Sequence, residues 1–255
     1  MLPYLTIAGV QVSTYIISLG TGLVISLLFL LKRAKMLLLK EDQDTLLAIC
    51  GPVIVTALFC AFLHNKFVSY STWESFRSAF FHYTGIAFLG GLLGGMIAFC
   101  AAYLVFFRGK YPLREMLDLM TPSVIVGHLI GRIGCLLGGC CYGKPNACFG
   151  IHFAVGTPAF QEYGDIPLIP TQIMEIILLA VLLAAVSHTG KLKFPVYLLL
   201  YSAGRFVIEF FRGDMRGTGF GPLSPAQVIC ILLLILGIVD LSFRLQFLSR
   251  NKEEV

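Results

Sequence analysis

Long apolar runs follow one another along the whole chain and constrain its fold more than any other feature. A helix that crosses the hydrocarbon core of a bilayer needs about 20 apolar residues. Seven segments are expected to be such helices: 11–31, 46–64, 80–107, 116–140, 170–188, 194–211 and 224–243. The fourth and sixth are the least apolar, since they contain Arg132 and Arg205. The sequence therefore predicts an all-α integral membrane protein, with 1–255 as a single polytopic membrane domain.

Composition and charge fit a chain embedded in lipid. Hydrophobic residues make up 57% of the chain and charged residues 13%, and the mean hydropathy is +0.85. Soluble domains carry roughly a quarter charged residues. With the N-terminus outside and the C-terminus in the cytoplasm, twelve Lys and Arg fall in cytoplasmic segments and five in outer ones. This bias satisfies the positive-inside rule. The distribution of the basic residues thus predicts the orientation of a multi-pass membrane protein, and nucleic acid is not expected as a partner despite the net charge of +5.

Ionisable residues inside the predicted spans carry the functional signal. Five of them are singled out: His128, Arg132, Glu175, Arg205 and Glu209. A charge at the bilayer centre costs roughly 2.5–3.5 kcal/mol on insertion scales, so such groups usually face a bundle interior. Arg205, Glu209 and Arg212 share one helix face that leads to the outer side, and arginine binds phosphate bidentately. This pattern predicts a site for a phospholipid headgroup. An ion pair between Arg205 and Glu209 with a purely structural role is the alternative.

Paired glycines stand four residues apart in FLGGLLGGM, residues 88–96. Small residues at this spacing let two helices pack closely in a membrane. The other interpretation is a surface on which a lipid approaches the backbone. On that interpretation Gly90 and Gly91 are candidate substrate contacts.

Four of the eight cysteines lie within fourteen residues at the predicted outer membrane edge: Cys135, Cys140, Cys141 and Cys148. An oxidising compartment favours a disulfide there, whereas a reactive thiol would need a pKa lowered by nearby cations. The spacing C-x4-C-C-x6-C is not a standard zinc pattern, and no metal is expected. The other four cysteines stand singly in apolar spans, which is typical of small core residues.

Three ordered segments together resemble one known family. They are GRIGCLLGGCCYGKP (131–145), which includes Gly134 and Gly143, PTQIMEIILL (170–179), which includes Gln172 and Glu175, and LYSAGRFVIEFFRGD (200–214). They are similar to the G-R-x-G-N-F-x-N-x-E-x-x-G, P-T-Q-x-x-E and R-F-x-x-E-x-x-R segments of prolipoprotein diacylglyceryl transferases. Tyr15 stands where that family has a tyrosine in its first span.

The chain departs from the family pattern in its polar residues. Cys135 and Gly138 replace the two signature asparagines, Cys140 replaces the signature glutamate, and Leu89 stands at the histidine of the family's H-G-G. The arginines and Glu209 are kept. The resemblance implies transfer of a diacylglyceryl group from phosphatidylglycerol to the lipobox cysteine of a prolipoprotein signal peptide, by a multi-pass protein of the bacterial inner membrane. No strong motif of the sequence implies a cofactor.

The resemblance also implies roles for individual residues. Arg132 and Arg205 would stabilise the negative charge of the glycerol-1-phosphate leaving group, with Arg205 held by Glu209. The acceptor thiol needs a general base, for which His128 and Tyr15 are the candidates. Predicted substrate contacts are Gly90, Gly91, Gly134, Gly143, Gln172, Glu175 and Arg212.

Two other functions stay open at this point. The chain could be a lipid-modifying or thiol-redox enzyme that uses Cys135, Cys140 or Cys141 on a different acceptor. It could also bind or transport lipid without catalysis, although the sequence shows no repeated halves of the kind common in transporters.

Overall fold

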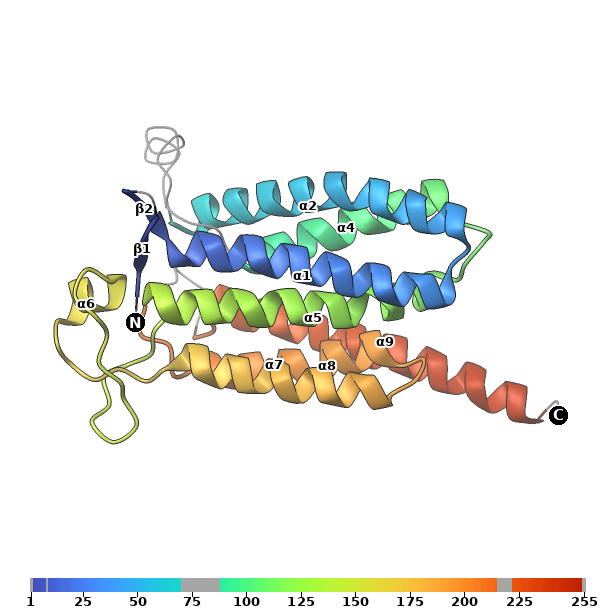
Figure 1. Ribbon diagram of the computed structural model, residues 1–255. Coiled ribbons are helices and arrows are strands. Elements are labelled where there is room, and N and C mark those ends of the chain that lie inside the picture. Colours follow the sequence, from blue (N-terminus) through green and yellow to red (C-terminus); the bar gives the residue numbers. More distant parts are fainter. Residues whose placement is uncertain (1, 8, 70–87, 215–221, 254–255) are drawn as a thin grey trace. The chain divides into compact units, whose positions relative to one another are not determined.

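Helices dominate the computed structural model, which describes residues 2–7, 9–69, 88–214 and 222–253. The elements are β1 (Tyr4–Ile7), β2 (Val10–Ser13), α1 (Thr14–Leu37), α2 (Lys40–Ser69), α4 (Phe88–Phe106), α5 (Leu113–Gly138), α6 (Pro158–Tyr163), α7 (Thr171–His188), α8 (Lys193–Glu209) and α9 (Pro225–Glu253) (Figure 1). A described helix falls on each of the seven predicted spans. Five of these helices, α1, α2, α5, α7 and α9, are long and apolar enough to cross a membrane. The fold is therefore that of a multi-pass, mainly helical membrane protein.

The two remaining helices, α4 and α8, do not meet this criterion of length and apolarity. The apolar helical stretch of α4 runs over Gly90–Phe106, and residues 80–87 of the predicted span lie outside the described residues. Helix α8 has 17 residues, and the buried charged side chains of Arg205 and Glu209 lower its apolarity.

The N-terminal boundary of the first predicted span is wrong. Residues 11–13 belong to β2, which pairs antiparallel with β1 in the register Tyr4↔Ser13 and Ile7↔Val10. The segment VQVS alternates apolar and polar residues, the period of a strand rather than of a helix. Helix α1 therefore begins at Thr14, whose amide donates to the Pro3 carbonyl oxygen at 3.1 Å.

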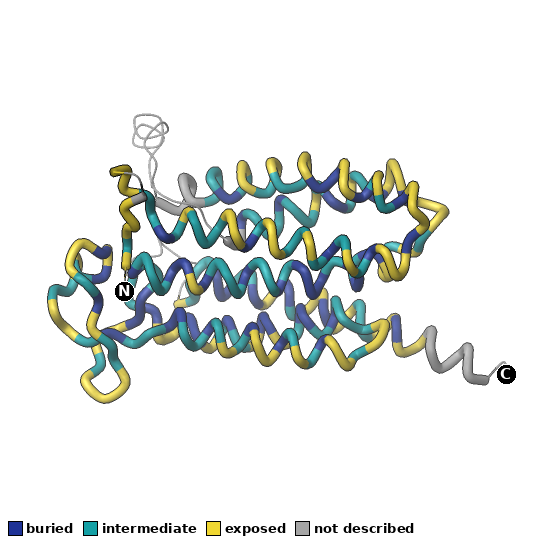
Figure 2. The backbone as a smooth tube through the Cα atoms, in the orientation of Figure 1, coloured by how far each residue is buried: buried dark blue, intermediate teal, exposed yellow. Residues whose placement is uncertain are grey.

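Contacts divide the chain into two compact units. The first comprises Met1–Leu30, Leu117–Met215 and Gln227–Val255. Within it, Asp118 of α5 accepts a hydrogen bond from the Phe194 amide of α8 at 2.8 Å and pairs with Arg244 of α9 at 2.6 Å. Half of the apolar window of α5 is buried, and Figure 2 shows few exposed positions along this helix. Helix α5 is thus the central helix of its unit.

The second unit comprises Leu31–Met116 and Arg216–Ala226. Here α2 and α4 pack antiparallel through the paired glycines. A Cβ atom at Gly90 would lie 2.3 Å from His64 Cβ, and one at Gly91 would lie 3.3 Å from the Ala57 carbonyl oxygen. This geometry supports the interpretation of close helix packing. A lipid contact at Gly90 and Gly91 stays a prediction.

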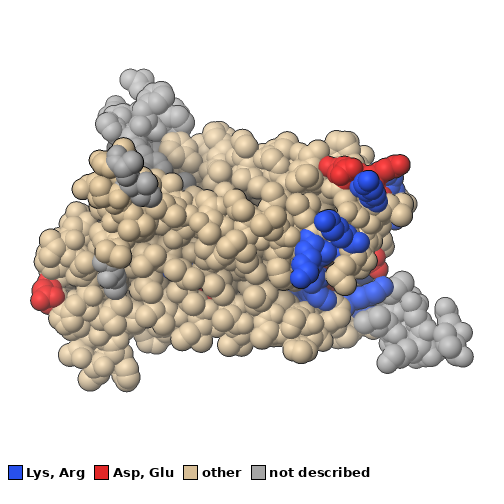
Figure 3. Space-filling view, in the orientation of Figure 1, with Lys and Arg blue, Asp and Glu red and all other residues tan. Residues whose placement is uncertain are grey.

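The exposed charged side chains of the described residues avoid the apolar length of the helices. The face drawn in Figure 3 shows no Lys, Arg, Asp or Glu side chain of the described residues along the middle of the helices. Such a band without charge is what the hydrocarbon core of a bilayer requires.

The connection between α5 and α7 is built as a small folded cap. Gly139 ends α5 with a left-handed φ of 65°, and a Cβ atom there would lie 2.5 Å from Thr157 Cβ. Thr157 in turn caps the N-terminus of α6 by accepting the Phe160 amide. The cap has its own hydrophobic cluster of Tyr142, Phe153, Ala159 and Leu168.

Candidate active site

Three helices of the first unit place polar side chains at one buried location. Helix α5 provides His128 and Arg132, α7 provides Glu175, and α8 provides Arg205 and Glu209. On α5 and α8 the paired residues are four apart, so each pair projects from one helix face. The structure therefore brings together all five ionisable residues that the sequence singled out within spans.

Glu175 is the centre of this cluster and is fully buried. Its Oε1 atom lies 3.0 Å from Arg132 Nη2, 3.4 Å from His128 Nε2 and 3.9 Å from Arg205 Nε. A buried carboxylate needs such partners, since desolvation of an unpaired charge costs several kcal/mol. Glu175 therefore holds the two arginines of different helices in position.

Arg205 is shared between this centre and Glu209. Its Nη2 atom lies 2.6 Å from Glu209 Oε2, within α8. Its Nη1 atom is buried and has no hydrogen-bond partner among the described residues. The ion pair proposed as a structural alternative is thus present, and it still leaves one buried guanidinium donor for a ligand.

Arg212 lies just beyond the end of α8 and forms a bidentate pair with Asp214. Its Nε and Nη2 atoms donate to the two carboxylate oxygens at 2.8 and 2.7 Å. Its Nη1 atom is buried and without a partner in the part of the chain that the structure describes. Burial raises the pKa of Asp214 to about 6, against the opposing charge of Arg212. The pair is therefore formed at neutral pH.

Backbone hydrogen bonds fix Arg212 to the segment that follows α5. The Lys144 amide donates to the Phe211 carbonyl oxygen at 2.9 Å, and the Gly213 amide donates to the Tyr142 carbonyl oxygen at 3.1 Å. Gly143 lies between these bonds, and a Cβ atom there would come within 2.7 Å of the Phe211 carbonyl oxygen. Gly143 thus has a structural reason to be glycine, and its predicted contact with substrate remains a prediction.

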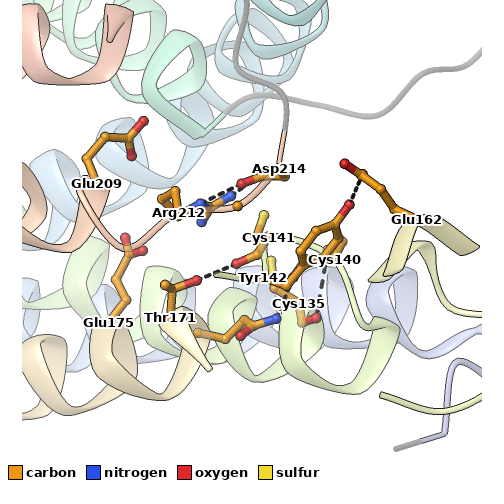
Figure 4. A network of polar contacts seen from close by, with 12 residues as sticks. Cys135, Cys140, Cys141, Tyr142, Glu162, Thr171, Glu175, Glu209, Arg212 and Asp214 are labelled. Atoms are coloured by element: carbon orange, nitrogen blue, oxygen red, sulfur yellow. Dashed lines mark hydrogen bonds and ion pairs between the residues drawn. The ribbon is translucent and has the colours of Figure 1, made fainter. Parts of the chain in front are cut away.

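The cysteines at the end of α5 form a compact group. The Sγ atoms of Cys135, Cys140 and Cys141 all lie within 4.8 Å of one another, and Figure 4 shows them beside Arg212 and Asp214. Thiols of Cys135 and Cys140 and the charge of Arg212 lower the pKa of the Cys141 thiol well below its usual value.

All eight cysteines are free thiols, so the structure does not bear out a disulfide in the outer loop. Its backbone is held instead by hydrogen bonds. Gln172 Nε2 donates to the Cys140 carbonyl oxygen at 2.7 Å, and Thr171 Oγ1 donates to that of Cys141 at 2.6 Å. Gln172 therefore supports the loop, and a direct contact of Gln172 with substrate stays a prediction.

The two candidate bases lie in different surroundings. His128 Nε2 accepts a hydrogen bond from Arg132 Nε at 3.2 Å, so its ring belongs to the buried cluster. Tyr15 is half-buried on α1 and faces α5, because a Cβ atom at Gly134 would lie 3.5 Å from Tyr15 Cδ2. The same glycine lets Ser18 approach α5. A role of His128 or Tyr15 in proton transfer stays a prediction.

Sequence reasoning missed Tyr201 and Asp214. Tyr201 donates to Glu175 Oε1 at 3.2 Å and packs edge-on against His128, with ring centroids 5.4 Å apart. Its position four residues before Arg205 was a usable signal, since the two side chains share one face of α8. Asp214 had no comparable signal, because its role depends on the fold of the chain after α8.

Comparisons with known proteins agree on one family. Residues 3–243 match the family model described as "Prolipoprotein diacylglyceryl transferase". Phosphatidylglycerol–prolipoprotein diacylglyceryl transferase 2 of Clostridium perfringens is 32% identical over an alignment of 260 positions, gaps included. This alignment covers 97% of this chain and 96% of that protein. The transferase of Clostridium tetani is 38% identical over 60% of this chain and 62% of its own length. That of Dehalococcoides mccartyi strain BAV1 is 30% identical over 80% of this chain and 79% of its own.

Proposed function

Because the chain belongs to the prolipoprotein diacylglyceryl transferase family, we propose that it transfers a diacylglyceryl group from phosphatidylglycerol to the cysteine thiol of a prolipoprotein signal peptide. Curated relatives carry this activity in their names. The observation that supports it most is the pair of buried guanidinium nitrogens of Arg205 and Arg212 that have no hydrogen-bond partner among the described residues. They are the donors that a phosphate ester requires.

The reaction is an exchange of a carbon–oxygen bond for a carbon–sulfur bond. The acceptor thiol gives its proton to a base, and its sulfur attacks the glycerol carbon that carries the phosphate ester. The carbon–oxygen bond breaks, and glycerol-1-phosphate leaves with the electron pair on oxygen. Fixed guanidinium groups in a site with little water stabilise that developing charge strongly. Arg132 and Arg205 take this role, and His128 or Tyr15 receives the proton.

The proposed site lies at the outer leaflet of the bacterial inner membrane. With seven spans and the N-terminus outside, Arg212 and the cysteines would lie on the outer side, and the excess of Lys and Arg in the cytoplasmic segments supports that orientation. Phosphatidylglycerol would enter from the lipid with its headgroup near Arg212. The signal peptide of the prolipoprotein is the proposed acceptor.

Labelled phosphatidylglycerol and a lipobox peptide test the proposal. The purified wild-type chain should form a diacylglyceryl thioether detectable by mass spectrometry. The Arg205→Ala variant should lose about 100-fold or more of the rate, as removal of one preorganised donor does elsewhere. The exposed Arg108 provides the matched control, and Arg108→Ala should retain the wild-type rate.

Three results would count against this function. They are no thioether from a chain that still binds the lipid, an unchanged rate in Arg205→Ala, and loss of product in Cys140→Ser with full lipid binding. The last would favour an enzyme that uses its own thiols on a different acceptor. Retention of product in Cys140→Ser is the expected result.

A further inference from the structure

We propose that Cys135, Cys140 and Cys141 form a three-thiolate site for one soft metal ion, with monovalent copper as the matching ion. This site adjoins the proposed transfer site, since Arg132 and Arg212 act on Cys141 as well, but the proposal does not rest on the transfer reaction. The three Sγ atoms lie within 4.8 Å of one another. A metal bound in a trigonal plane by thiolates at about 2.3 Å separates the sulfurs by about 4 Å. The group can therefore close around one ion without movement of the helices.

Backbone conformation and hydrogen bonds to the backbone fix the positions of these three cysteines. Cys135 is buried in the last turn of α5, and Cys141 has a φ of 63°, the one left-handed conformation among non-glycine residues of the described chain. The carbonyl oxygens of Cys140 and Cys141 are fixed by the side chains of Gln172 and Thr171. Supporting hydrogen bonds of this kind orient metal ligands in proteins.

The ligand set determines the class of ion. All three ligands are sulfur, which excludes Mg²⁺ and Ca²⁺, since these bind through oxygen. Within the described residues no His, Asp or Glu joins the group as a fourth ligand, whereas structural zinc takes four. Soft thiolate ligands select monovalent copper. A trigonal all-sulfur site therefore fits Cu⁺ best.

The surrounding charges fit the resulting complex. Three thiolates and one monovalent ion carry a net charge of −2, which would be costly next to a bilayer without nearby cations. The guanidinium groups of Arg132 and Arg212 both interact electrostatically with Cys141. Figure 4 shows the Arg212 side chain on the same side of the segment as the Cys141 sulfur. These arginines stabilise an anionic metal–thiolate group.

A copper titration of the full-length protein tests the site. The reduced protein in detergent is titrated anaerobically with Cu⁺, against a competing chelator, and the thiolate-to-copper absorption in the near ultraviolet is recorded. One Cu⁺ should bind per chain. Cys135→Ser, Cys140→Ser and Cys141→Ser should each weaken binding by about 100-fold or more. Cys148→Ser removes an exposed thiol of the same loop and should bind as the wild type does.

A second measurement needs no variant and so does not depend on the folding of one. Cu⁺ should protect the three thiols of the wild-type chain, and not Cys148, from alkylation, as located by mass spectrometry. Several results would overturn the proposal: no bound copper, equal affinity in the three variants, or binding of Zn²⁺ but not of Cu⁺. A disulfide within the group that forms even in the reduced, anaerobic protein would overturn it as well.

Discussion

Glu175 has the largest expected effect of any single side chain on stability. Its Oε1 atom pairs with Arg132, accepts a hydrogen bond from Tyr201 and lies 3.4 Å from His128 Nε2. Glu175→Gln would leave the guanidinium groups of Arg132 and Arg205 buried without their shared carboxylate. Loss of one partner of a buried pair typically costs about 3–5 kcal/mol. We expect a clear fall in the unfolding temperature in detergent.

The control for Glu175 is an exposed carboxylate. Asp165 pairs with His152 at the surface, where its side chain is 77% exposed. Exposed pairs contribute about 0–1 kcal/mol, so Asp165→Asn should leave the unfolding temperature almost unchanged. Equal effects of the two substitutions would contradict the central role of Glu175.

Asp214 gives the protein a specific dependence of stability on pH. Its pKa is about 6 in the folded chain and 3.8 as the ordinary value. Between these values the folded state holds a proton that the unfolded state has lost, so this group's stabilising contribution is complete below pH 3.8 and is lost as the pH rises through 6. Over this pH range the titration of Asp214 changes the free energy of unfolding by about 1–3 kcal/mol.

Asp214→Asn removes that titration. The unfolding temperature of the variant relative to that of the wild type should therefore rise between pH 4.5 and pH 7.5. A difference that stays constant over this range would show that the carboxyl group titrates normally.

At the scale of elements, the strand-like pairing of residues 142–144 with residues 211–213 positions the outer arginine. Gly143→Ala would place a Cβ atom against backbone oxygens of Ile169 and Phe211, so the segment must move and Arg212 with it. A displacement of about 1 Å can cost up to 100-fold in rate. We expect a fall of about 10- to 100-fold in transfer of the diacylglyceryl group.

Gly20 on α1 provides the matched control for that substitution, since a Cβ atom there would meet nothing within 4 Å among the described residues. Gly20→Ala should retain the rate. If Gly143→Ala also transfers at the wild-type rate, the pairing does not position Arg212.

The sequence predicted the positions of the helices better than it predicted the contacts between them. Apolar length locates the spans, and the spacing of Arg205 and Glu209 predicts their pairing. The hairpin before α1 was missed because its second strand, VQVS, directly precedes the long apolar run of α1. Its short alternation of apolar and polar residues was therefore counted as part of that run. The central role of Glu175 was also missed, because α7 carries a single charge whose partners lie on α5 and α8. The meeting of three cysteines depends on the turn at Gly139 and Cys141, which linear spacing does not encode.

At the scale of the whole molecule, the orientation in the membrane can be measured. Cys148 is exposed in the cap after α5, and Lys191 is exposed between α7 and α8. In intact cells a membrane-impermeant maleimide should label Cys148. In a Lys191→Cys variant, the new thiol should react only after permeabilisation. The reverse pattern would show that the N-terminus faces the cytoplasm.

Every buried arginine of the proposed site already has a carboxylate beside it: Glu175 for Arg132, Glu209 for Arg205 and Asp214 for Arg212. The empty site is therefore close to electroneutral, and it need not carry counterions from the water into the membrane. A bound phosphate ester brings negative charge that these arginines only partly balance. The liberated glycerol phosphate carries more negative charge than the diester it came from, and the carboxylates beside the arginines weaken their hold on that dianion. Such a site avoids being trapped by its own product, and its turnover benefits from arginines that are never wholly unpaired.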